Sequence, residues 1–468
     1  MPMRPSPAAL PRLLCMLLVL AGGASAAMAQ DAQPTPAQWQ AEQIAAFDKS
    51  ERIFDQAKQV RGLLAQYQLM RNAYDGDKGA AFHAIFSQYV SWYQTYIGDY
   101  VAAERSFSIA QPAQPGDAPS PLADPRWHAL PALDAITALA KDRKAIFLNE
   151  NHSAPITRTL TVQLLAKLRA EGFNTFAAET LYNSDMPALA RRGYPVRATG
   201  FYTEEPIYAE MVRSALKLGY RVVAYEAESD ATGDAREYEQ ALNLYDRAIK
   251  GHPGARLVVN AGYAHVQKQG VYLGGRSMAE HFMQVSGIDP LVVEQTMLFG
   301  HINVSDDQPT WSAVIAALHP TQPIVFEDAA GRPWSLRPGA YDVSVFFPQE
   351  LLVRDRPTWL SLGGLRDPYQ VGDGLCMGHF PCLIDARYRD EGADAVPADR
   401  LVLECPGEVR LLWLRPGRYR LSARDLDDHV LLREEARVTP QTLPGNGSPP
   451  SAYREHRCSR DRVQSVTQ

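Results

Sequence analysis

The chain has 468 residues, of which 46% are hydrophobic and 21% are charged, and its formal net charge is −6. This balance is typical of a globular protein, and the length predicts about two to three domains. The surplus of acidic residues excludes the basic composition that nucleic-acid binding favours.

The first predicted element is a signal peptide at residues 1–29. Arg4 and Arg12 precede the apolar stretch Leu13 to Ala21, and small-residue cleavage sites follow it. That stretch is too short to span a bilayer, and no later one reaches the roughly 18 apolar residues of a transmembrane helix. We therefore expect export to the periplasm or secretion. Without the two arginines of the signal, 45 basic and 53 acidic residues give a formal charge of −8.

Residues 30–110 are predicted to be helical. Apolar residues recur at roughly helical spacing over 36–73, and a second helical stretch covers 78–110. Within it, the run from Tyr96 to Glu104 is similar to part of a tetratricopeptide repeat, and an ordinary helical hairpin packed on the next domain is the alternative. These helices are a candidate surface for a protein partner. The Pro- and Ala-rich residues 111–125 predict a linker.

Residues 126–305 are predicted to form an α/β domain with a mostly parallel sheet flanked by helices. Short apolar runs alternate there with amphipathic helical patterns, which favours that architecture. The strand candidates are Ala145 to Leu148, Thr175 to Ala178, Arg221 to Tyr225, Leu257 to Asn260 and Leu291 to Met297. After the first of them, Leu160, Leu164 and Leu168 form one apolar helical stripe, and Gly172 predicts its end.

Residues 320–439 are predicted to form a β-sandwich-like domain, followed by a polar tail at 440–468. Two Pro-Gly turns, at 337–339 and 415–417, each lead into alternating apolar residues.

Four cysteines lie in the last quarter of the chain, and export predicts up to two disulfides. They are Cys376, Cys382, Cys405 and Cys458. Four cysteines allow three pairings, among which the sequence does not choose. A zinc site with His379 is the alternative, although the spacing matches no standard zinc motif.

Ionisable side chains stand at successive strand ends of the predicted sheet. Glu150 and His152, two residues apart in an extended segment, point the same way. The carboxyl ends of parallel strands share one edge, where α/β proteins bind ligands. We therefore expect one cleft that gathers residues from four strand ends, with Arg236 in reach of it: Glu150, His152, Glu179, Glu226 and His265.

Four motifs follow one another over residues 144–267: Asn149-Glu150-Asn151-His152, Gly172-Phe173 leading to Ala178-Glu179, Arg236-Glu237 with Ala241 and Asn243 on a helix, and Ala261-Gly262-Tyr263-Ala264-His265-Val266. Their order resembles the erythromycin esterase, ChaN-like and Tiki superfamily. Asn149 stands where that superfamily favours glycine. The resemblance implies one of three activities: lactone hydrolysis by a histidine acting on water, metal-dependent proteolysis, or haem binding.

The leading functional hypothesis is a hydrolase of ester, lactone or peptide bonds. His152 would be the general base for a water, oriented by Glu150, and His265 would assist protonation or hold the substrate oxygen. Glu179 and Glu226 would orient the histidines. Two further residues are candidates for contacting the substrate or transition state: Arg236 and Tyr263.

Two alternatives use the same residues. In the first, His152 and His265, with Glu150 or Glu179, hold a divalent zinc, manganese or cobalt ion that activates water. In the second, the chain is a haem or iron carrier, with Tyr263 as a candidate iron ligand, or a module without catalysis.

Overall fold

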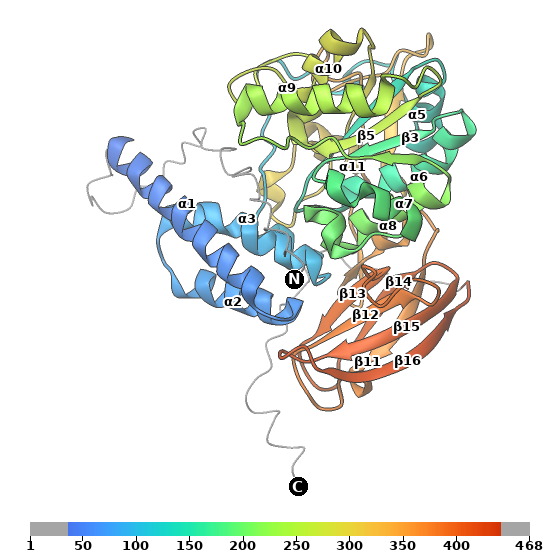
Figure 1. The fold of residues 1–468 in the computed structure, drawn as a ribbon. Helices are drawn as coiled ribbons and strands as arrows, with labels where there is room; N and C mark the ends of the chain where they lie inside the picture. The colour runs from blue at the N-terminus through green and yellow to red at the C-terminus, as the bar shows by residue number, and fades with distance from the viewer. Residues whose placement is uncertain (1–35, 441–468) are drawn as a thin grey trace.

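The computed structural model describes residues 36–440, in three parts (Figure 1). The predicted signal peptide at 1–29 and nearly all of the predicted tail at 440–468 lie outside the described residues. No helix within 36–440 has the length and apolar character needed to cross a membrane.

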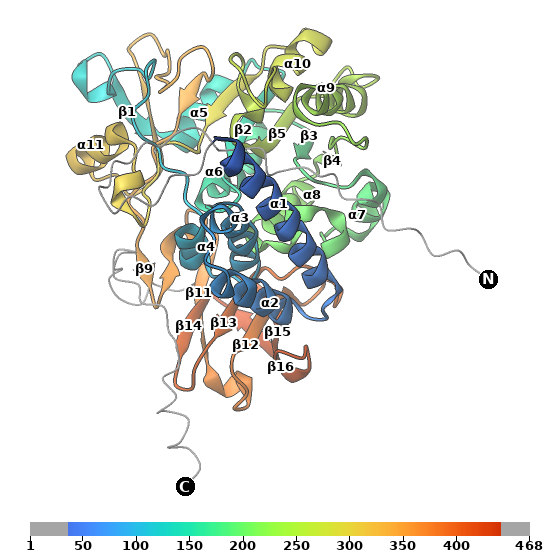
Figure 2. The same cartoon turned by 90° about the vertical axis from the view of Figure 1, so that its left-hand side faces the viewer.

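The N-terminal part is helical, as predicted, and its helices lie beside the rest of the molecule (Figures 1 and 2). It contains α1 (Pro36–Gln59), α2 (Leu63–Gly76), α3 (Ala80–Tyr96) and α4 (Tyr100–Ser106). The second half of α3 is buried on all sides, because α3 lies between α1 and the α/β part. The segment similar to a tetratricopeptide repeat covers the end of α3, the turn at Gly98 and the seven-residue helix α4.

The central sheet has six parallel strands in the order β4-β3-β5-β2-β6-β8. All five predicted strands are present, and β2 and β5 are buried along their whole length at the middle of the sheet. The strands are β2 (Ala145–Glu150), β3 (Thr175–Ala178), β4 (Arg221–Val223), β5 (Leu257–Gly262), β6 (Leu291–Glu294) and β8 (Val343–Ser344).

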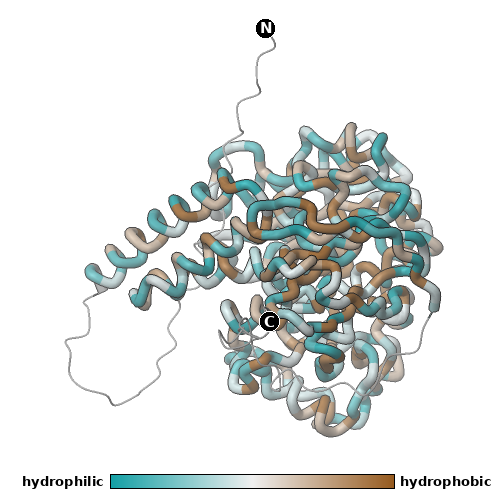
Figure 3. The backbone as a smooth tube through the Cα atoms, turned by 90° about the horizontal axis from the view of Figure 1, so that it is seen from below, coloured by the Kyte–Doolittle hydropathy of each residue, from teal (hydrophilic) through white to brown (hydrophobic). Residues whose placement is uncertain are grey.

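Helices cover both faces of this sheet. Ile146 and Leu148 of β2 pack with α5 (Ala132–Ala140), α6 (Ile156–Ala170) and α8 (Pro206–Lys217). Ala145 and Phe147, which alternate with them, pack on the opposite face with α9 (Gly233–Leu244), α10 (Met278–Ser286) and α11 (Pro309–Leu318). The short helix α7 (Met186–Arg192) follows β3. In Figure 3 the hydrophobic segments concentrate inside the body of the molecule.

Helix α6 illustrates how the sequence pattern becomes structure. Leu160, Leu164 and Leu168 are all buried, as the stripe predicts. Gly172 follows the helix with φ +93°, a backbone conformation that glycine adopts without strain. The helix begins at the carboxyl end of β2, so it holds the residues after His152 against the sheet edge.

The C-terminal part consists of antiparallel sheets. The strands of one sheet are β12 (Cys382–Tyr388), β13 (Asp399–Leu403), β15 (Gly417–Arg424) and β16 (Val430–Val438), and a second sheet pairs β11 (Asp367–Gly372) with β14 (Val409–Leu414). Two shorter antiparallel pairs join β1 (His128–Pro131) to β7 (Ile324–Glu327) and β9 (Leu352–Val353) to β10 (Arg356–Pro357).

The boundary of the C-terminal part differs from the one predicted at residue 320. Strand β8, which follows the predicted turn at 337–339, pairs in parallel with β6 and completes the central sheet. Strand β7 pairs with β1, at the start of the α/β part. Strand pairing depends on tertiary contacts, which an alternating pattern alone does not specify.

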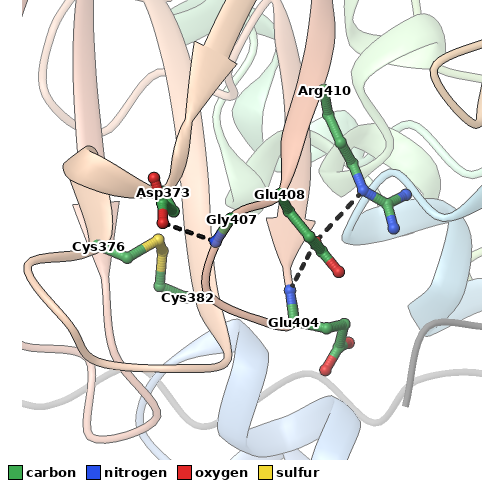
Figure 4. Close-up of a disulfide and its surroundings, with 7 residues drawn as sticks. All are labelled: Asp373, Cys376, Cys382, Glu404, Gly407, Glu408 and Arg410. Atoms are coloured by element: carbon green, nitrogen blue, oxygen red, sulfur yellow. Dashed lines mark hydrogen bonds and ion pairs between the residues drawn. A yellow bond between two sulfur atoms is a disulfide. The ribbon is translucent and has the colours of Figure 1, made fainter. Parts of the chain in front are cut away.

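Cys376 and Cys382 form a disulfide in the C-terminal part, with their Cα atoms 5.8 Å apart (Figure 4). Cys405 is also disulfide-bonded. Cys458 lies outside the described residues. The disulfides replace the zinc alternative, because oxidised sulfur atoms are not the thiolates that ligate zinc.

Candidate active site

Glu150 and His152 lie side by side at the carboxyl end of β2. Both side chains are buried, and Nδ1 of His152 is 3.0 Å from Oε1 of Glu150. An ionised carboxylate only accepts hydrogen bonds, so the Nδ1 proton belongs to His152 and Nε2 is left for other chemistry. The ring stacks on Tyr202 with 4.2 Å between centroids and meets Tyr263 edge-on at 5.1 Å.

Arg158 determines the charge of Glu150. Its Nε lies 2.7 Å from Oε2 and its Nη2 lies 2.8 Å from Oε1, while Asn260 donates to Oε2 over 2.6 Å. Burial raises the pKa of Glu150, but the Arg158 charge and the hydrogen bonds from His152 and Arg158 outweigh burial and hold that pKa well below its usual range. Glu150 is therefore an ionised acceptor.

The second histidine, His265, lies on the 3-10 turn Tyr263–Val266 that follows β5. Its Nδ1 is 2.7 Å from Oε2 of Glu237 on α9, and the same oxygen accepts the N–H of Met278 over 2.9 Å. Burial lowers the pKa of His265, but the charges of Glu237 and Glu179 outweigh burial and raise it above the ordinary histidine value. The two histidines thus share one arrangement, in which Nδ1 binds a buried carboxylate.

Glu179, directly after β3, lies between the two imidazoles. Nε2 of His152 is 3.8 Å from its Oε2, and Nε2 of His265 is 3.5 Å from its Oε1. Burial raises the pKa of Glu179, but His265, His152 and Arg236 lower it below the usual value. Gly262 donates its N–H to Oε2 over 2.5 Å, and a Cβ at this position would lie 2.4 Å from Nε2 of His152, so only glycine permits this approach.

Arg236, on the first turn of α9, is surrounded by three carboxylates. Its Nη2 lies 2.9 Å from Oε1 of Glu226 and 3.6 Å from Oε1 of Glu179, and its Nη1 lies 3.5 Å from Oε1 of Glu237. Gln240 donates to the same oxygen of Glu226 over 2.8 Å. The guanidinium therefore compensates the negative charge of the site.

A further layer lies behind Glu150. Nη1 of Arg158 binds Glu205 over 2.9 Å. Glu205 caps the start of α8 through the N–H groups of Ile207 and Tyr208, and it accepts the hydroxyl of Tyr100 on α4 over 2.9 Å. The N-terminal helices therefore connect to Glu150 through Glu205 and Arg158.

Six buried polar atoms around the histidines have no hydrogen-bond partner among the described residues. They are Oε1 of Glu179, Nε of Arg236, Oε1 of Glu237, Oε1 of Gln240 and the hydroxyls of Tyr202 and Tyr272. Oε1 of Glu179 and Oε1 of Glu237 keep ion-pair contacts of 3.5–3.6 Å with Arg236 or His265. An unpaired buried polar group costs about 1–3 kcal/mol, so these atoms leave hydrogen-bonding capacity for water or a ligand.

The structure brings together all five residues that the sequence placed at one sheet edge: Glu150, His152, Glu179, Glu226 and His265. Arg236 and Tyr263 also lie in the cluster. Four further residues of the cluster were not predicted as site residues: Glu237, Arg158, Glu205 and Tyr202. The sequence does point to Glu237, because it belongs to the Arg236-Glu237 motif. It also points to Glu205, because an acid before Pro206 predicts a helix start.

The predicted metal ligands do not fit a compact metal site. Among residues 36–440, the group whose ligand atoms all lie within 4.8 Å of one another is Asp425, Asp427 and His429, at the exposed turn between β15 and β16. Both oxygens of Glu150 are bound by Arg158. For haem, the Tyr263 hydroxyl is already bound to Asn151 over 3.1 Å, and its ring contacts His152.

No known protein family and no curated protein sequence matches this chain. Among solved structures, one of bacterial protein toxins is 18% identical with a TM-score of 0.28 and covers 35% of this chain and 36% of its own. The type III effector HopBA1 is 15% identical, with a TM-score of 0.25, and covers 36% of this chain and 87% of its own.

RRSP, a MARTX toxin effector domain from Vibrio vulnificus, is 16% identical with a TM-score of 0.24 and covers 49% of this chain and 51% of its own. The chain thus spans about a third of the first of these structures. Similarity this weak carries no conclusion about activity.

Proposed function

We propose that the protein is an exported hydrolase of ester, lactone or peptide bonds that activates water with the two histidines. The observation that carries this proposal is the pair of imidazoles, each bound at Nδ1 by a carboxylate and each with Nε2 toward Glu179. The motif resemblance to the erythromycin esterase, ChaN-like and Tiki superfamily supports the same class of chemistry.

His152 is the general base. Its Nδ1 proton is held by Glu150, so Nε2 takes a proton from water, and the resulting hydroxide adds to the carbonyl carbon of the substrate. The Glu150 carboxylate stabilises the imidazolium that forms, because the two charges are opposite and buried.

His265 is the general acid. The Glu237 and Glu179 charges favour its protonated form, so it donates a proton to the leaving oxygen or nitrogen when the acyl bond breaks. The products are a carboxylic acid and an alcohol or amine, which balances the added water.

Arg236 has a positioning role in this scheme. Three carboxylates engage its guanidinium, so it holds them near the histidines and is not free to stabilise the oxyanion. The unpaired hydroxyl of Tyr202, whose ring stacks on His152, is the better oxyanion donor.

The test is a turnover assay on ester, lactone and peptide substrates with the purified mature protein and three variants, H152Q, H265Q and H301Q. His301 is the matched control, because it is also buried and its Nδ1 lies 3.1 Å from a carboxylate, that of Asp307, outside the site. We expect the first two variants to lose at least about a hundredfold in kcat/KM and the control to keep its activity. Equal activity in all three variants would refute the site.

The same protein preparation tests the two alternative functions. Activity that survives prolonged dialysis against a chelator supports acid–base catalysis without a metal. Activity that is lost on dialysis and restored by zinc, manganese or cobalt supports the metal-dependent mechanism. A Soret band after incubation with haem, without turnover of any substrate, supports the hypothesis that the protein is a haem carrier.

A further inference from the structure

A cleft lies where the N-terminal helices meet the α/β part, beside the candidate active site. Its volume is about 140 Å³, and five of its lining residues are aromatic: Phe54, Tyr93, Tyr96, Tyr182 and Phe201. Phe201 directly precedes Tyr202, whose ring stacks on His152. Tyr182 lies four residues after the end of β3, the strand that Glu179 follows, so the cleft lies close to the cluster although no histidine of the cluster lines it.

The aromatic walls of this cleft are held in place by other rings. The ring of Phe201 lies 6.0 Å from Phe54 and 5.3 Å from Trp92, centroid to centroid. Its carbonyl accepts the hydroxyl of Tyr96 over 3.2 Å. An apolar cavity of about 150 Å³ holds one benzene ring, so this cleft has the volume for a single planar ring. Preformed walls bind such a ring at low entropic cost.

Two cations, Lys58 and Arg197, stand at the rim of the cleft. Lys58 pairs with the exposed Asp55 over 2.9 Å, and Nε of Arg197, whose side chain is 57% exposed, lies 3.7 Å from Oε2 of Glu204. The charge of Glu204, the acid in the lining, is balanced by buried Arg400, whose Nη1 is 3.0 Å from Oε1. Because pairs this exposed contribute little, an anionic group on a bound ring can replace Asp55 and Glu204 as the partner of these two cations.

We propose that this cleft is the substrate subsite and that it takes one planar ring carrying a carboxylate. The ring lies between the aromatic walls, the carboxylate meets Lys58 and Arg197, and the bond to be hydrolysed points toward Tyr182 and Tyr202. The substrates are small esters of hydroxylated aromatic acids. Hydrolysis of such an ester rests on the proposed function, whereas binding of the aromatic acid does not.

The first test measures binding of 4-hydroxybenzoate by calorimetry, which requires no turnover. The variant K58E reverses one rim charge, and K49E is its matched control. Lys49 is also on α1, also lies over an aromatic ring, that of Phe82, and also pairs with an aspartate, but it is outside the cleft. We expect K58E to weaken binding about tenfold and K49E to leave it unchanged.

Thermal unfolding at the same Tm shows that both variants fold. Equal affinity in K58E and K49E, or phenol binding as tightly as 4-hydroxybenzoate, would overturn the subsite. Since the rim charges are exposed, the preference for the anion should also shrink as salt is raised toward 1 M.

The second test compares turnover of 4-acetoxybenzoate, phenyl acetate and ethyl acetate. Water adds across the acyl bond of the first to give acetate and 4-hydroxybenzoate, and we expect kcat/KM to fall in the order given. Binding of 4-hydroxybenzoate without turnover of any ester would refute the hydrolase and keep the subsite. Turnover of all three esters at similar rates, with no binding, would refute the subsite and keep the hydrolase.

Discussion

At the scale of single residues, the two imidazoles differ in what surrounds them. Both face Glu179, and each binds a second carboxylate at Nδ1. Arg158 binds both oxygens of Glu150 over 2.7 Å and 2.8 Å, whereas Arg236 approaches Glu237 only to 3.5 Å. For His265, the charges of Glu237 and Glu179 outweigh burial and raise the pKa, which favours the acid role proposed for it.

The contacts of Arg158 with Glu150 and Glu205 are predicted to contribute much more to the free energy of unfolding than a surface ion pair does. R158M leaves Glu150 and Glu205 buried without a cation, so we expect a loss of about 3–5 kcal/mol in the free energy of unfolding, measured with urea. R61M removes the exposed pair with Asp428 and should cost less than about 1 kcal/mol. Similar losses in both variants would contradict the role given to Arg158.

His265 is also predicted to couple stability to pH. Its pKa is raised in the folded state, so its protonation stabilises the fold below the unfolded pKa of about 6.5, and this stabilisation is lost as pH rises through the raised value. The difference in unfolding free energy between wild type and H265Q should therefore be larger at pH 6 than at pH 9. A difference independent of pH would contradict the raised pKa.

At the scale of elements, the turn between α3 and α4 fixes the N-terminal helices to the C-terminal sheets. Gly98 has φ +79°, its carbonyl accepts from Nη1 of Arg356, and Nη1 of Arg400 binds the carbonyl of Tyr96 over 2.9 Å. Tyr96 ends α3 and Tyr100 begins α4, and their hydroxyls bind the carbonyl of Phe201 and the carboxylate of Glu205. This turn therefore sets the position of the wall that α1 and α3 contribute to the aromatic cleft.

G98A is predicted to be severely destabilising. A Cβ there would lie 2.0 Å from the carbonyl oxygen of Arg400, and the positive φ adds strain, so we expect a loss of about 3 kcal/mol or more in unfolding free energy. G116A is the control, because Gly116 has φ +97° and open space around it, and its strain alone should cost about 1 kcal/mol. Equal costs would mean that the turn can move away from Arg400.

At the same scale, the strands of the central sheet and the site residues at their carboxyl ends could be predicted from sequence. Runs such as Ala145 to Leu148 and Leu257 to Asn260 are buried and continuous in hydrophobicity, and the ionisable residues directly after them must share one edge of a parallel sheet. Arg158 and Glu205 could not be paired this way, because their contact depends on how α6 packs against α8. For the same reason, the segment that forms β8 was predicted to belong to the C-terminal β-rich part, whereas it pairs with β6 in the central sheet.

At the scale of the whole molecule, buried ion pairs join the α/β part to the C-terminal sheets. Arg213 on α8 donates to both oxygens of Glu391, over 2.6 Å and 2.9 Å, and Arg415 donates to Glu210 over 2.6 Å. Breaking a buried pair leaves an uncompensated charge, so the two parts are expected to move as one body. The disulfide between Cys376 and Cys382 lies inside the C-terminal part and does not contribute to this junction.

The disulfide is predicted to matter for stability and not for activity. Replacing both Cys376 and Cys382 with serine opens a loop of six residues, which should lower the free energy of unfolding by about 2 kcal/mol. The kcat/KM for any substrate found should stay at the wild-type value. A loss of activity in the folded double variant would place the C-terminal sheets in the function of the site.

The central claim, that His265 is the acid and is tuned by Glu237, is tested most directly by kcat/KM measured against pH in wild type and E237Q. Glu237 raises the pKa of His265, so the activity of the wild type should fall at a pH above the ordinary histidine pKa of about 6.5, as His265 loses its proton. In E237Q that fall in activity should move to lower pH. E280Q is the control, because Glu280 on α10 pairs with Arg276, and there the fall should not move. An alkaline fall at the same pH in wild type and E237Q would contradict the account.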